Sequence, residues 1–178
     1  MTHAITHPVT QSHFADAIAL LKADHRHFDD LFEAFGKSRW PVRRQSVAHQ
    51  ICTELAIHIN LEEDLFYPAL RGRVADDLLD RALARLDETR ILMRLVETAN
   101  PRDEFYAAKM HVLAQSVRSH VQEEELFQHG LFARCRRAAV DLVTLGKAMI
   151  ARRGALVAQA RPVGLPMGRN GLRLVAAA

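Results

Sequence analysis

The sequence has few of the residues that build disulfide frameworks or membrane spans. Its 178 residues include two cysteines, Cys52 and Cys135, which form no CxxC motif, so we expect reduced, buried thiols rather than a disulfide framework. No run of 18 apolar residues predicts a membrane span. Residues 1–14 are polar and lack the apolar core of a secretory signal. These absences favour a cytoplasmic protein.

Proline and glycine are also scarce, with six and eight residues. Alanine, leucine, arginine and glutamate dominate instead, and these residues favour helices over strands. A chain with 49% hydrophobic and 25% charged residues fits one globular domain. No nucleophilic triad, phosphate loop or zinc-finger spacing occurs, and the HExxH spacing of a hydrolytic zinc site is missing. The composition therefore predicts an all-α domain.

The net charge of +3 hides an uneven distribution. Residues 131–178 contain nine Lys or Arg residues and one acid, Asp141, whereas the first 130 residues contain 15 basic and 20 acidic residues. We expect the basic C-terminal segment to lie on an acidic bundle, because charge balance of this kind governs association. Aromatic residues do not alternate with the basic ones, so no nucleic-acid partner and no membrane partner are expected.

Hydrophobic periodicity predicts five helices. They cover approximately residues 12–37, 41–70, 74–98, 102–129 and 131–160, with breaks at Trp40-Pro41, Gly72, Asn100-Pro101 and Gly130. Tyr67-Pro68 should loosen the end of the second helix. Pro and Gly predict an irregular tail at the C-terminus. The predicted organisation is a flexible tail over 1–12, a helical bundle over 13–132, a C-terminal helix over 133–160 and an irregular tail over 161–178.

One motif occurs twice in the sequence. His58 and Glu62 are four residues apart, as are His120 and Glu124, and the two copies are separated by 62 residues. This spacing puts both side chains of a pair on one face of a helix, and each pair lies on the apolar stripe. The repeat predicts two helical hairpins that pack as an antiparallel up-down four-helix bundle.

A second alignment matches the first predicted helix with the third. With an offset of 63 residues His25 matches Glu88, and we expect both to face inward between the two His/Glu pairs. Imidazole and carboxylate groups are ligands of non-haem iron, manganese or zinc, and an inward-facing set on helices indicates a two-metal centre. Two divalent ions balance three carboxylates and one hydroxide, as a low-dielectric core requires. The candidate metal ligands are His25, His58, Glu62, Glu88, His120 and Glu124.

These residues resemble the hemerythrin-like HHE cation-binding family. The resemblance covers about residues 14–132 and rests on Asp24-His25, on His58-x-x-x-Glu62-Glu63 followed by Phe66-Tyr67-Pro68, and on His120-x-x-x-Glu124-Glu125. It implies a four-helix bundle that holds a non-haem di-iron centre, with two Fe ions bridged by an oxo or hydroxo group and two carboxylates. Matching positions would make His25, His58 and His120 terminal ligands, and Glu62 and Glu124 bridging ligands.

The chain departs from the family pattern in its third predicted helix. The family normally has one or two histidines there, whereas no histidine lies between Gly72 and Asn100 and the matching position is Glu88. A third carboxylate would stabilise ferric iron, so we expect redox reaction, detoxification or sensing of O₂, NO or peroxide rather than reversible O₂ carriage. The alternatives are a second metal that is weakly held or absent, and a Glu88 that pairs on the surface with Arg85 or Arg81.

Two classes of function fit these residues. The first is a di-iron binding or sensing protein, and the second is a di-iron oxidase, a peroxidase-like enzyme or an NO-handling enzyme. Mn or Zn could replace Fe, and the expected ligand is a small diatomic molecule or peroxide. A third reading is a metal-free helical interaction module whose core histidines are satisfied by glutamates. The apolar stripe of the last helix, with Leu142, Leu145 and Met149, indicates a cap on the bundle or a homodimer face.

Overall fold

The computed structural model describes residues 15–160, and all regular structure in this part of the chain is helical. The predicted tails over 1–12 and 161–178 lie outside the described residues. The elements are α1 (Ala17–Lys37), α2 (Pro41–Leu61), the π-helix η1 (Glu62–Phe66), α3 (Tyr67–Leu70), α4 (Asp76–Glu97), α5 (Tyr106–Glu125), α6 (Leu131–Arg137) and α7 (Leu142–Ala160).

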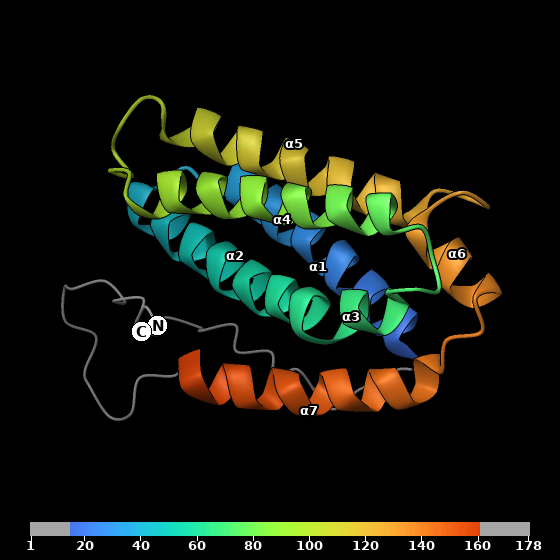
Figure 1. Ribbon diagram of the computed structural model, residues 1–178. Helices are drawn as coiled ribbons and strands as arrows, with labels where there is room; N and C mark the ends of the chain where they lie inside the picture. Colours follow the sequence, from blue (N-terminus) through green and yellow to red (C-terminus); the bar gives the residue numbers. More distant parts are fainter. Residues whose placement is uncertain (1–14, 161–178) are drawn as a thin grey trace, which may run out of the picture.

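Helices α1, α2, α4 and α5 form the predicted four-helix bundle (Figure 1). Asp16 caps the N-terminus of α1, and its side chain accepts a hydrogen bond from the backbone N–H of Ala19 at 2.8 Å. The apolar stripe of α1 is buried, from Ile18 to Phe35. Pro41 stands in the first turn of α2, where a missing N–H costs little. The bundle interior is therefore built by helical periodicity.

The single helix predicted over 41–70 is interrupted. Residues Glu62–Phe66 form a π-helical turn, in which the N–H of Tyr67 donates to the carbonyl of Glu62. A π-turn adds one residue to the helical circuit, and such turns are frequent at functional sites. Tyr67 consequently lies above Glu62 on the inner face and is buried. The predicted loosening near Pro68 thus begins several residues earlier, at Glu62.

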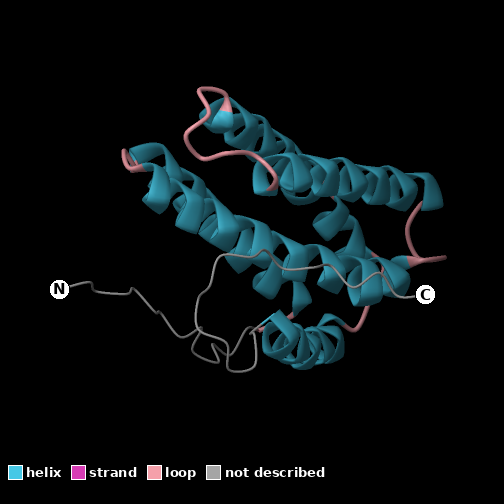
Figure 2. Ribbon diagram, turned by 90° about the vertical axis from the view of Figure 1, so that its left-hand side faces the viewer, coloured by secondary structure: helices cyan, strands magenta, loops and turns pink. Residues whose placement is uncertain are grey.

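The single helix predicted over 131–160 is wrong. Helices α6 and α7 are separated at residues 138–141, where Ala139 has a φ of 50°, a left-handed conformation that ends α6. Helix α7 packs along α1, α2 and η1, on the side of the bundle away from α5 (Figure 1 and Figure 2). Leu142 and Met149 of its apolar stripe are buried. The interpretation of this stripe as a cap is confirmed, while the homodimer stays a prediction.

Charge pairs join the basic C-terminal segment to the bundle, as the sequence predicts. Arg136 of α6 pairs with Asp16 at 3.3 Å. Arg152 of α7 pairs with Asp64 at 2.7 Å, and the next residue, Arg153, pairs with Asp24. The uneven distribution of charge along the chain therefore corresponds to contacts between α6 or α7 and the acidic bundle.

Both cysteines of the chain lie in the helical core. Cys52 and Cys135 are both buried and unbonded, and burial raises the pKa of each thiol to about 12. Such thiols are unreactive. Among the helices of residues 15–160, none is long and apolar enough to cross a membrane.

Candidate metal centre

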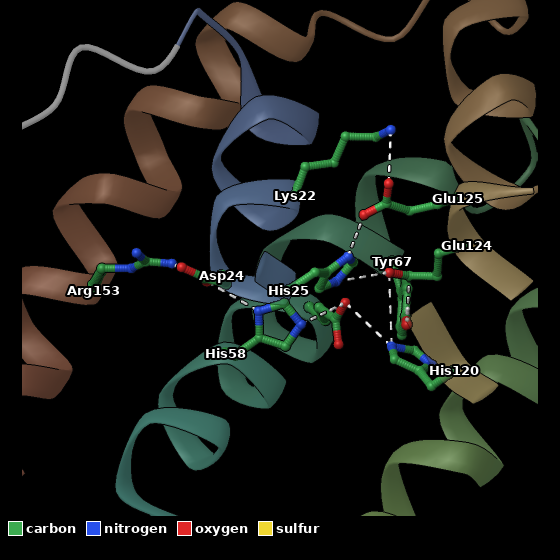
Figure 3. A network of polar contacts seen from close by, with 10 residues as sticks. Lys22, Asp24, His25, His58, Tyr67, His120, Glu124, Glu125 and Arg153 are labelled. Carbon is green, nitrogen blue, oxygen red and sulfur yellow. Dashed lines mark hydrogen bonds and ion pairs between the residues drawn. The ribbon is translucent and has the colours of Figure 1, made fainter. Parts of the chain in front are cut away.

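Five of the six predicted ligands meet inside the bundle (Figure 3). Each is at most 5% exposed. Three different helices and the π-turn supply them, because each helix turns its apolar stripe inward and carries its polar residue with it. The five are His25 from α1, His58 from α2, Glu62 from η1, and His120 and Glu124 from α5.

Each glutamate lies between two histidines. The Glu62 Oε1 atom is 3.3 Å from Nε2 of His58 and 3.6 Å from Nε2 of His120. The Glu124 Oε2 atom is 3.5 Å from Nε2 of His25 and 3.7 Å from Nε2 of His120. All three Nε2 atoms therefore face the same small volume as the two carboxylates.

Several of these buried atoms have no hydrogen-bond partner within the described chain. They are Nε2 of His25, Nε2 of His120, both carboxylate oxygens of Glu62 and Oε2 of Glu124. A buried polar atom without a partner costs about 1–3 kcal/mol, and native proteins contain few of them. Five such atoms facing one volume are the donor set that a cation would satisfy, so the residues present fit a metal.

The donors divide into two sets that share one residue. Within residues 15–160, one donor atom from each of His25, His58 and Glu62 lies within 4.8 Å of the others, and the same holds for Glu62, His120 and Glu124. Glu62 belongs to both sets, so it would serve either set if a metal bound there. Glu124 contacts His25 of the first set and His120 of the second, and its bridging role stays a prediction.

Two of the histidines contact a carboxylate through Nδ1, while their Nε2 atoms face the cluster. Nδ1 of His25 is 2.7 Å from Oε1 of Glu125, and Glu125 also pairs with Lys22 at 2.8 Å. The hydrogen bond from His25 lowers the pKa of Glu125 to about 2, so this carboxylate is charged. A carboxylate that accepts the Nδ1 proton leaves Nε2 free for a metal and orients the ring.

The second carboxylate is Asp24, which serves His58. Its Oδ2 atom is 3.0 Å from Nδ1 of His58, and Arg153 pairs with the same oxygen (Figure 3). Burial alone would raise the pKa of Asp24, but His58 and Arg153 lower it. The two histidines of the first donor set thus have the same kind of support, a carboxylate paired with a cation.

The pKa values show how the cluster balances its charge without a metal. Burial alone would lower the pKa of His58, but Glu62 and Asp24 raise it to about 10. Burial also opposes the charge on His120, whose pKa Glu124 and Glu62 raise to about 9. Burial and the charge of Glu62 raise the pKa of Glu124 to about 8. The metal-free cluster therefore holds protons that a bound cation would displace.

Glu88 does not join the cluster, so the expectation that it faces inward is wrong. Its side chain is 58% exposed and pairs with Arg85 at 3.1 Å, the surface alternative. The inward-facing residue is its neighbour Thr89, which is buried beside His120. One residue is about 100° around a helix, so an alignment that is wrong by one position turns the side chain from the core to solvent.

Three supporting residues were only partly visible in the sequence. Asp24 and Glu125 adjoin predicted ligands, but their contacts with His58 and His25 cross between helices. Tyr67 reaches the cluster because of the π-turn, and its hydroxyl donates to Oε1 of Glu124 at 3.1 Å. Burial, then the charge of Glu124, raises the pKa of Tyr67 well above its usual value, so the phenol keeps its proton. No local pattern could have identified Arg153.

The other histidines of the described chain are not near the cluster. His27 is half-exposed and pairs with Glu54 at 2.7 Å, and His49, His111 and His129 are exposed.

Two hollows adjoin the cluster. A small cavity of about 10 Å³, room for about one water-sized molecule, lies beside the three histidines and is otherwise mainly apolar, with Phe28 and Val117 in its wall. A surface groove of about 340 Å³ runs along α1 and α5, and Phe28 and Val117 line it as well. The cluster therefore has space beside it for a small molecule.

Comparison with known proteins agrees with this geometry. The family model of the hemerythrin HHE cation binding domain matches residues 16–129. A solved structure of a hemerythrin HHE cation binding domain-containing protein, the Rv2633c homolog from Mycobacterium kansasii, superposes with a TM-score of 0.69 and 20% identity, covering 82% of this chain and 89% of that one. A DNA nickase from Nostoc sp. is 24% identical over 106 residues, which are 60% of this chain and 30% of that protein's length.

Proposed function

The chain belongs to the hemerythrin HHE cation-binding family, and we propose that its buried His/Glu cluster is a non-haem di-iron centre that reacts with, or senses, a small oxidant such as O₂, NO or peroxide. The observation that carries this proposal is the set of five buried donor atoms of His25, His120, Glu62 and Glu124 that have no hydrogen-bond partner within residues 15–160, with His58 completing the donor groups. A mixed imidazole and carboxylate set suits iron, and the same donors accept Mn or Zn.

The residues divide between two ions. His25, His58 and Glu62 would hold one ion, and His120 and Glu124 with the shared Glu62 would hold the other. Iron bound there supplies one-electron redox chemistry. Without Glu88, the site has two carboxylates in place of three, so its balance is one charge more positive than the sequence alone indicates.

The chain's own residues prepare the site for a small reactant. Glu125 and Asp24 orient His25 and His58. The cavity beside the histidines admits only a very small molecule, and its apolar wall excludes charged ones because a lone charge is costly to bury there. The Tyr67 hydroxyl holds a proton at hydrogen-bond distance from Glu124, where a general acid would stand.

A redox or sensing role is favoured over oxygen carriage. Helix α4 turns Leu86, Thr89 and Met93 inward and supplies neither histidine nor carboxylate, so the site has fewer imidazole donors than the His-dominated shell of an O₂ carrier. The match to the Nostoc nickase covers 30% of that protein, and we do not extend DNA nicking to this chain.

Metal analysis of protein purified without air tests the proposal. We expect about two iron ions per chain, because the two donor sets of the bundle share one bridging residue. Glu62→Gln should lose most of the metal, since both sets use this carboxylate, whereas Glu88→Gln should keep it. Circular dichroism should show equal helix content in both variants. Less than about half an equivalent of iron, manganese and zinc together would overturn the proposal, because a built site is expected to be filled.

Spectroscopy then separates the roles. We expect the visible spectrum of the reduced iron protein to change on addition of O₂, NO or H₂O₂, and not to return when the gas is removed. A stable band that disappears under vacuum would mean carriage and would contradict the redox role.

A further inference from the structure

Arg153 lies outside the residues matched by the family model, yet it is linked to the candidate metal centre through Asp24. The family model ends at residue 129, and Arg153 is in α7. Its guanidinium donates to Oδ2 of Asp24, 129 residues earlier in the chain, and the same oxygen is 3.0 Å from Nδ1 of His58 (Figure 3). A chain of two contacts thus runs from α7 to a candidate ligand.

The pair between Arg153 and Asp24 is shielded from solvent. Their side chains are 17% and 15% exposed, whereas the neighbouring pair of Arg152 and Asp64 is 39% and 41% exposed. Exposed ion pairs contribute little, but removing one partner of a buried pair leaves an uncompensated charge. Loss of Arg153 would therefore affect Asp24 much more than loss of Arg152 would affect Asp64.

Close helix packing fixes the position of Arg153. A Cβ atom added at Gly146 would lie 2.8 Å from the backbone nitrogen of Ala17, so α7 approaches α1 more closely there than any other residue would allow. Met149 is fully buried one turn further on. Arg153 follows Met149 by four residues and so stands on the same face of α7, toward Asp24.

The support of the two histidines differs in origin. His25 contacts Glu125, and Glu125 pairs with Lys22 of α1. All three residues belong to the four-helix bundle. The carboxylate behind His58 depends on a cation from α7. One side of the cluster is thus linked to a helix outside the four-helix bundle.

We propose that Arg153 is a positioning residue of the metal centre, which holds Asp24 so that His58 keeps Nε2 directed at Glu62. This inference rests on the proposed metal function. Docking of α7 then controls how firmly the His58 side of the centre retains metal, and it sets the redox potential, because the hydrogen-bond partner of a metal-bound imidazole tunes its basicity.

Metal retention in matched variants is the first test. We expect a chelator to extract iron about tenfold faster from Arg153→Gln than from the wild type. Loss of a residue that supports a metal ligand typically weakens metal binding by about tenfold or more. Arg152→Gln is the control, and its rate should stay within about twofold because the pair it breaks is exposed. Equal rates in the two variants would overturn the inference.

The midpoint potential supplies a readout that a merely structural role would not move. In Arg153→Gln the charge of Asp24 is no longer offset, so His58 becomes a stronger donor and the potential should fall. Arg153→Lys should restore part of the shift, because it returns the cation. In the double variant with Asp24→Asn, loss of Arg153 should have no further effect. A full additional shift there would contradict action through Asp24.

A measurement on metal-free protein separates this inference from the metal function. In ¹⁵N-histidine NMR spectra the Nδ1 proton of His58 should exchange with solvent faster in Arg153→Gln than in Arg152→Gln. Gly146→Leu, which keeps Arg153 but displaces α7, should reproduce the faster exchange. Unchanged exchange in both Arg153→Gln and Gly146→Leu would overturn the role of Arg153. A wild type without metal would instead overturn the proposed function, and the exchange rates would still decide this inference.

Discussion

Glu62 is fully buried between two histidines, and its pKa is lowered although burial alone would raise it. His58 and His120 cause this shift, because each lies within 4 Å of the carboxylate and carries a proton. Neither Glu62 oxygen has a hydrogen-bond partner among residues 15–160. In the metal-free protein, the two protonated histidines thus supply the positive charge that bound cations would supply.

The stability of the metal-free protein should fall as the pH rises from 6 to 9. His58 and His120 have pKa values of about 10 and 9 in the folded chain, above the ordinary value of about 6.5 for the unfolded chain. The folded protein therefore holds more protons than the unfolded chain in this window. Each extra proton lowers the free energy of unfolding by about 1.4 kcal/mol for every unit by which the pH rises. Glu124, with its raised pKa of about 8, acts in the same direction.

Thermal unfolding with a chelator present measures this dependence. The depressed pKa of Glu62 acts with the opposite sign, but only at acid pH, where that carboxylate titrates. With metal bound, the trend between pH 6 and 9 should reverse, because protons compete with the metal for the same donors. An unfolding temperature that rises with pH in the metal-free protein would contradict protonation of His58 and His120.

Among the connecting segments, the turn after α5 is the most tightly packed around a glycine. A Cβ atom at Gly130 would lie 2.5 Å from the carbonyl oxygen of Glu124 and 2.6 Å from the backbone nitrogen of Leu126. These are backbone atoms, so they cannot move aside as a flexible side chain would. Glu124 is itself a candidate ligand, which links the shape of this turn to the centre.

Gly130→Ala should destabilise the protein by about 1–3 kcal/mol, as overpacking does, and should also weaken metal retention. Gly154→Ala is the matched control, because a Cβ there meets no atom within 4 Å. It should stabilise α7 by about 0.5–1 kcal/mol through helix propensity. Chemical denaturation of both variants checks the pair, and equal changes of the same sign would contradict it.

The molecule as a whole divides its helices between ligand supply and support. Helices α1, α2 with η1, and α5 carry the candidate ligands, whereas α4 contributes buried apolar side chains and Thr89. Helix α6 covers the cluster with Phe132, whose ring stacks on His25 with a centroid distance of 5.8 Å. Metal should therefore stabilise some helices directly and others only through packing.

Hydrogen exchange with and without iron should reveal this division. Amide protection should increase most in α1, α5 and residues 55–66, because bound metal ties them together, and least in α4. Proteins open in local units, so protection can rise in one helix without an equal rise in its neighbour. The same increase in α4 as in α5 would contradict the absence of a ligand from α4.

Much of the site was predictable from local spacing. Residues four apart share a helical face, so the spacing alone identifies the two His/Glu pairs. The apolar residues on the same face predict that both pairs point inward. Glu88 was predicted wrongly because a weak repeat leaves the alignment uncertain by one residue, which is about 100° of rotation. Leu86, Thr89 and Met93 set the rotation of α4, because burying them costs less than burying a carboxylate without a partner.

The sequence by itself determined the helical class, the doubled His/Glu pairs and the basic C-terminal segment, because each depends on residues close together in the chain. Only the tertiary structure decided which residues support those pairs. Arg153 and Asp24 meet across 129 residues, and Tyr67 reaches Glu124 through a π-turn. Contacts of this kind depend on how whole helices rotate and pack, which is settled by the sum of burial over the molecule rather than by any local pattern.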